Sequence, residues 1–136
     1  QSDAPDLLAS LAAGELPAPR FAAEASVVKY LVPQEYPEKS PAGILFQLDE
    51  AAVKAAGFLL LPASVESSGQ SWRTLGSRTL ALYGSGGQPG EISARMETLL
   101  EKIEPPELRH RRDVGAAEVL AARGAEMARL RGGKAQ

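Results

Sequence analysis

The clearest periodic pattern in the chain lies between residues 89 and 103. Apolar residues recur there three or four positions apart, which places them on one face of a helix: Ile92, Met96, Leu99, Leu100 and Ile103. Pro89 is well suited to the first helical turn. The pattern therefore predicts an amphipathic helix whose apolar face lies on the protein core.

Three other segments have the pattern of strands. Residues 27–32 are rich in β-branched and aromatic residues, and residues 78–83 alternate so that Leu80 and Leu82 share one side. Residues 58–61 form a continuous apolar run, which is typical of a strand covered on both faces. We expect these segments to contribute to a sheet of three or four strands.

A further apolar run, residues 44–48, precedes a short segment with helical preference at residues 50–56. Asp49 is placed to cap that helix, and Gly57 to end it. The strand candidate at 58–61 follows directly, so the three pieces resemble a strand–helix–strand unit. A parallel crossover through so few connecting residues is sterically cramped. Residues 63–76 are polar and read as a loop.

The end of the chain has a weaker helical pattern. Residues 107–130 predict a long helix, interrupted by two glycines, with a narrow apolar stripe: Ala116, Leu120, Met127 and Leu130. We therefore expect an α+β fold or a small α/β fold, in which one amphipathic helix packs on the sheet. Residues 1–104 would form the domain, beginning with a short helix, and residues 105–136 a helical arm.

Composition narrows the classes of function. The 136-residue chain has no cysteine, which excludes disulfides and thiolate metal sites, and its net charge of −2 disfavours nucleic-acid binding. No apolar run is long enough for a membrane span. The first residue is Gln1 and not Met, which is consistent with a processed, exported or organellar chain, but the sequence does not identify a compartment.

The residue patterns of common catalytic sites are missing. The one histidine, His110, lies in an arginine-rich run, where we expect it on a solvated helix face. No serine stands in a nucleophile motif, and the adjacent Asp49 and Glu50 do not share a helix face. We therefore predict no catalytic residues, no metal, no cofactor and no enzymatic activity.

A glycine-rich segment between a predicted strand and a predicted helix is an alternative binding site. Backbone N–H groups in such a loop can hold a small anion or a phosphate, and the residues concerned are Gly84, Ser85, Gly86, Gly87 and Gly90. The segment matches neither the P-loop nor the dinucleotide-binding fingerprint. A flexible strand-to-helix turn explains the same glycines without a ligand.

The leading hypothesis from the residues is a non-catalytic, accessory subunit or adaptor that binds another protein. The predicted C-terminal helix is longer than its own core requires, and the connections are rich in proline. The candidate partner-binding residues are Trp72, Tyr36, Leu120, Met127, Leu130, Arg111 and Arg112. Weak nucleic-acid binding by the arginines of this helix is a third hypothesis.

Overall fold

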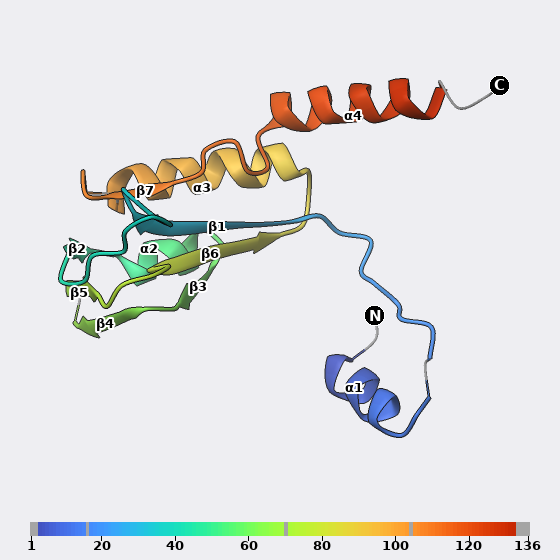
Figure 1. Ribbon diagram of the computed structural model, residues 1–136, viewed down its shortest axis with the longest axis horizontal. Coiled ribbons are helices and arrows are strands. Elements are labelled where there is room, and N and C mark those ends of the chain that lie inside the picture. Colours follow the sequence, from blue (N-terminus) through green and yellow to red (C-terminus); the bar gives the residue numbers. More distant parts are fainter. Residues whose placement is uncertain (1–2, 16, 70, 104, 133–136) are drawn as a thin grey trace.

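The computed structural model describes residues 3–15, 17–69, 71–103 and 105–132. These residues form four helices and seven strands (Figure 1), in the order α1 (Ala4–Ala12), β1 (Ser26–Pro33), β2 (Leu45–Gln47), α2 (Glu50–Ala55), β3 (Leu59–Pro62), β4 (Val65–Ser68), β5 (Ser71–Thr74), β6 (Leu80–Ser85), α3 (Pro89–Ile103), β7 (Leu108–His110) and α4 (Ala117–Gly132). The fold is α+β, which confirms the predicted class.

The larger sheet has four antiparallel strands in the order β3-β6-β1-β7. Its centre is formed by β1 and β6, the two segments whose strand pattern is clearest in the sequence. Strand β2 lies in the other sheet, so the expected strand–helix–strand unit is not a parallel crossover. Helix α2 instead connects β2 of one sheet to the edge strand β3 of the other. Asp49 caps this helix by accepting a hydrogen bond from the N–H of Ala52 (2.9 Å).

The core lies between the larger sheet and α3. Alternate residues of β1 and β6 face α3, which contributes the apolar stripe predicted from the sequence; the buried cluster is Val27, Leu31, Phe46, Leu48, Val53, Phe58, Trp72, Leu80, Leu82, Ile92, Met96, Leu100, Ile103 and Leu108. Gly84 makes room for its neighbours in the core, because a Cβ there would lie 2.6 Å from the Phe58 ring and 3.0 Å from the side chain of Ile92 on α3. The side chains between the larger sheet and α3 are therefore closely packed.

A second sheet of three antiparallel strands has the order β2-β5-β4. Its strands β4 and β5 come from residues 63–76, which the sequence had indicated as a loop. Polar residues alternate with buried ones in β5, where Trp72 and Thr74 face inward. The Trp72 ring stacks on Phe46 with their centroids 6.3 Å apart, so this small sheet closes one end of the core.

The C-terminal region differs from the single long helix expected at residues 107–130. Residues 108–110 form strand β7, which pairs with β1, and α4 starts only at Ala117. Gly115 separates the two with a φ of +75°, a conformation that favours glycine. Helix α4 has no buried residue, and Figure 1 shows it projecting past the end of α3.

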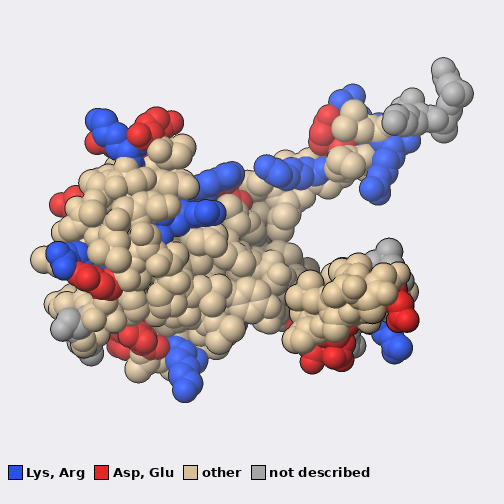
Figure 2. Space-filling view, turned by 60° about the horizontal axis from the view of Figure 1, so that its bottom comes forward, with Lys and Arg blue, Asp and Glu red and all other residues tan. Residues whose placement is uncertain are grey.

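Helix α1 lies apart from the rest of the chain. It has no buried residue and is joined to β1 by an extended segment (Figure 1). In Figure 2, α1 and α4 form two projections at the same end of the molecule, with open space between them. Within the described part of the chain, no helix combines the length and apolar character needed to cross a membrane.

Candidate functional site

A buried lysine lies at the centre of the most unusual polar cluster. Lys29 follows the inward alternation of β1, between Val27 and Leu31, and its side chain is 0% exposed. Its Nζ donates a hydrogen bond to Oε1 of Glu97 on α3 and another, of 3.2 Å, to the carbonyl of Arg112. A buried ammonium is stable only when it is paired and hydrogen-bonded. Glu97 is therefore the residue that allows a lysine at this core position.

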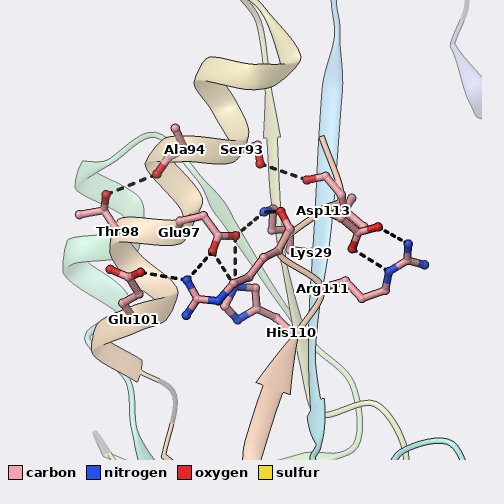
Figure 3. A network of polar contacts seen from close by, with 11 residues as sticks. Lys29, Ser93, Ala94, Glu97, Thr98, Glu101, His110, Arg111 and Asp113 are labelled. Atoms are coloured by element: carbon pink, nitrogen blue, oxygen red, sulfur yellow. Dashed lines mark hydrogen bonds and ion pairs between the residues drawn. The ribbon is translucent and has the colours of Figure 1, made fainter. Parts of the chain in front are cut away.

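His110, which Figure 3 shows beside Glu97, and Arg112 both contact the Glu97 carboxylate. The His110 ring is 1% exposed, with Nε2 placed 2.9 Å from Oε2 of Glu97. Arg112 lies at the surface, where its Nη1 is 3.3 Å from Glu97 and 3.0 Å from Glu101. One carboxylate on α3 thus links a residue of β1, a residue of β7 and the segment that follows β7.

The surroundings of Glu97 favour its ionised form. Burial raises the pKa of this carboxyl, but the hydrogen bonds from Lys29 and His110 and the charges of both residues lower it further, so the net pKa lies below the ordinary value. A carboxylate with a lowered pKa that is engaged by several donors is a poor general base near neutral pH. We call Lys29, Glu97, His110 and Arg112 the ion cluster. Its geometry is better suited to holding the chain in position than to transferring a proton.

The ion cluster fixes residues 111–115 against α3. Ser93 of α3 adds a hydrogen bond of 3.0 Å to the carbonyl of Val114. A Cβ on Gly115 would come within 3.0–3.2 Å of Val27 and Ser93, so only glycine brings the backbone this close. This segment therefore leaves the sheet along one defined path before α4 begins.

A hollow of about 270 Å³ lies between this fixed segment and the start of α4. It is lined by Arg111, Asp113, Val114, Gly115, Val119, Leu120 and Arg123. Arg111 Nε donates a hydrogen bond of 3.0 Å to Asp113. That bond, with smaller contributions from the charges of Arg111 and Arg123, lowers the pKa of Asp113. The hollow therefore presents two guanidinium groups and one ionised carboxylate.

The structure brings together only some of the candidate partner-binding residues. Arg111 and Leu120 line the hollow, whereas Arg112 turns toward α3. Met127 and Leu130 lie farther along α4 and are about half exposed. Their roles in binding stay predictions.

The two aromatic candidates lie elsewhere. Trp72 is 4% exposed in the core, so its indole contributes little surface to any partner. Tyr36 is half-buried in the turn after β1, and its carbonyl accepts a hydrogen bond from Arg109 of β7. Both positions are accounted for by packing within the chain, and partner contact by either residue remains untested.

The glycine-rich segment joins β6 to α3, as the sequence indicated. Gly86 and Gly87 have positive φ values of +93° and +55°, and the N–H of Gly86 donates to the carbonyl of Ala25. Gly90 lies against α4, where a Cβ would be 2.9 Å from that of Ala117. Packing and turn geometry thus account for these glycines, and anion binding by the segment stays a prediction.

Lys29, Glu97 and His110 are the residues that sequence reasoning missed. His110 was expected on a solvated helix face, but it is buried in β7 because that segment pairs with β1. A signal for the cluster was present in the alternation of β1, since Lys29 occupies an inward position between two apolar residues. A charge at such a position requires a buried partner, which the sequence alone does not identify.

The known proteins that are similar to this chain are named as enzymes. The chain is 32% identical over 119 residues to the phosphoribosylamine–glycine ligase of Pyrococcus furiosus, covering 88% of this chain and 26% of that protein. The ligase of the same name from Methanocaldococcus jannaschii is 34% identical over 111 residues, covering 82% of this chain and 25% of the relative. For that of Methanopyrus kandleri the identity is 32% over 137 residues, covering 97% of this chain and 30% of the relative. No protein-family model matches the chain.

These relatives overturn two predictions from the sequence. The relatives are named as ligases, so the predictions of a non-catalytic accessory subunit or adaptor and of no enzymatic activity are wrong. The chain spans about a quarter of the length of the curated relatives it matches. An active site can draw its residues from several domains, so the lack of a catalytic pattern within one quarter was no evidence against an enzyme.

Proposed function

We propose that this chain is one domain of a ligase that joins phosphoribosylamine to glycine. The observation that carries the proposal is the identity of 32–34% to ligases of that name, extending over 82–97% of the chain in the three relatives above. Matches of this extent include the sheet, α3 and the ion cluster, and are not confined to one short motif. The remaining residues of the ligase would complete the catalytic site.

Within such a ligase, we assign the ion cluster a positioning role. Lys29 and His110 are buried and both bond to Glu97, whose side chain is 21% exposed, so the three side chains have little capacity left for a substrate. They hold residues 111–115 and thereby set the position of Arg111 beside the start of α4. The cluster would act on the reaction through the segment that it fixes.

The hollow beside that segment is the part of this chain best suited to a substrate. Phosphoribosylamine carries a phosphate, and a guanidinium group binds phosphate through two parallel hydrogen bonds. Arg111 and Arg123 both line the hollow, and their two positive charges exceed the single negative charge of Asp113. Arg111 gives both its Nε and its Nη2 to Asp113, so Arg123 is the guanidinium that would take the phosphate. We therefore propose that this hollow contacts the phosphate of phosphoribosylamine.

A chimera tests the domain assignment. The segment of the Methanocaldococcus jannaschii ligase that aligns with this chain is replaced by the chain itself, and incorporation of labelled glycine is compared with that of the parent. The proposal predicts activity within about tenfold of the parent, and a parent that lacks the segment serves as the inactive control. A soluble, folded chimera without activity would contradict the assignment. If the chimera is insoluble, the purified chain is added to the shortened ligase instead. The rate of glycine incorporation with and without the added chain then tests the assignment.

The substrate contact has a separate test in the same chimera. Replacement of Arg123 by Gln should raise the KM for phosphoribosylamine at least fivefold and leave the KM for glycine within twofold. Arg129 lies on α4 outside the hollow and pairs with Glu126, so Arg129→Gln is the matched control. Equal effects of the two substitutions, or equal effects on both substrates, would contradict the contact.

A further inference from the structure

The face of the larger sheet that points away from α3 is apolar and exposed. The residues concerned alternate with the buried ones on three adjacent strands, and we call them the outer sheet face: Val28, Tyr30, Leu59, Leu61 and Tyr83. Leu59 pairs with Tyr83, which pairs with Val28. In the next row Ala81 lies between Leu61 and Tyr30. The side chains are therefore contiguous across three strands.

The exposure of this face is unusual for an antiparallel sheet in water. Such sheets commonly alternate apolar residues on the core side with polar residues on the solvent side. Here the solvent side carries exposed apolar side chains, with Leu59 60%, Leu61 44%, Tyr30 41% and Val28 37% exposed, and the Arg78 guanidinium lies 5.3 Å from the centre of the Tyr30 ring. Together these side chains present on the order of 300 Å² of apolar surface, the lower end of the range for the largest apolar patch on a typical monomer, which is often a functional surface.

We propose that the outer sheet face packs against another domain of the same ligase polypeptide. This inference rests on the proposed function. The relatives are about four times as long as the segment that this chain matches, so such a ligase has three quarters of its length to place around this domain. Helices α2 and α3 cover the opposite face of the sheet, which leaves the outer sheet face as its open side.

The area of the face favours a tethered domain over a separate partner. A stable complex between free proteins buries about 800 Å² on each partner, of which roughly 450 Å² is apolar, and this face offers less than that. A domain on the same polypeptide is held at a high effective concentration, so a smaller contact suffices. The same argument disfavours a second copy of this chain as the occupant.

Side-chain labelling tests the contact directly. Hydroxyl radicals are used to label Tyr30 and Leu59 in the free 136-residue chain and in the chimera, and the extents are compared by mass spectrometry. The proposal predicts at least a threefold decrease in the chimera. Leu45 is 70% exposed on β2 of the small sheet and provides the internal control, which should change by less than 1.5-fold. Equal labelling of Tyr30 and Leu59 in both proteins would overturn the proposal.

A paired substitution gives an independent readout. Leu59→Glu together with Leu61→Glu should leave the melting temperature of the free chain within about 2 °C, because both side chains are exposed there. In the chimera the same pair should at least triple the rate of limited proteolysis, whereas Leu45→Glu should not change it. Unchanged proteolysis in the chimera would contradict the contact. Sedimentation of the free chain as a dimer that Leu59→Glu dissociates would identify a second copy as the occupant and overturn the proposal.

The outcomes separate the contact from the proposed function. A chimera that is inactive but protected at Tyr30 and Leu59 would contradict the ligase assignment and retain the docking surface. An active chimera with both side chains fully labelled would retain the assignment and refute the docking surface.

Discussion

Replacement of Glu97 by Gln should strongly destabilise the isolated chain. The substitution preserves shape and removes the negative charge that balances Lys29, whose side chain is 0% exposed. Removing one partner of a buried ion pair typically costs about 3–5 kcal/mol. The Glu97 side chain keeps 21% exposure, so we expect the lower end, about 3 kcal/mol. That loss corresponds to a decrease in melting temperature of roughly 10 °C for a chain of this size.

Urea unfolding at pH 7, followed by circular dichroism, measures this effect and its cause. Glu101→Gln is the matched control, because Glu101 lies on the same helix, also pairs with Arg112 and is 57% exposed. The control should change the free energy of unfolding by at most about 1 kcal/mol. The double variant Lys29→Met with Glu97→Gln should be more stable than Glu97→Gln alone, because it no longer buries an unpaired ammonium. A loss below about 1 kcal/mol for Glu97→Gln, or a double variant that shows the sum of the single losses, would refute the reasoning.

Three further predictions concern pH, packing and the tryptophan. The pKa of Glu97 is lowered on folding, so the stabilisation of the fold by this carboxylate is present above the ordinary value of 4.5 and is lost as the pH falls through the folded pKa. Glu97→Gln should therefore flatten the fall in the free energy of unfolding below pH 5. Parallel acid unfolding curves for the variant and the parent chain would contradict this. Gly84→Ala places a Cβ 2.6 Å from the Phe58 ring and should cost roughly 1–3 kcal/mol in urea unfolding. Gly124→Ala in exposed α4 should be neutral or stabilise by up to about 1 kcal/mol, and equal effects of the two substitutions would show that Phe58 does not pack closely on Gly84. Trp72 is 4% exposed, so its fluorescence should resist acrylamide quenching until the chain unfolds, and quenching as strong as that of free tryptophan would place the indole on the surface.

Local sequence patterns predicted the elements in which one face packs on the core along the whole segment. Helix α3 starts at Pro89, the residue suited to a first helical turn, and ends with its apolar stripe at Ile103, and β1 and β6 follow from their β-branched residues and alternation. Residues 59–61 were correctly predicted as a strand, but the expectation that both faces are covered was wrong. Leu59 and Leu61 face outward, and no local pattern distinguishes a doubly covered strand from one with an exposed apolar face.

The missed elements depend on contacts between distant residues. Strand β7 has three residues, and it forms because Leu108 and His110 pair with β1 more than seventy residues earlier in the chain. Strand β5 is polar on one side and pairs with β2, which lies more than twenty residues earlier in the chain, while β4, among the described strands, pairs only with β5. The ion cluster was missed for the same reason, since its members come from three elements that only the tertiary fold brings together.

The most direct test of the central claim is the ligase activity of the chimera in which this chain replaces the aligned quarter of the Methanocaldococcus jannaschii relative. We expect the chimera to incorporate labelled glycine at a rate within about tenfold of the parent, and the shortened parent to incorporate none. A folded chimera that incorporates no more glycine than the shortened parent would contradict the assignment of this chain as a domain of such a ligase.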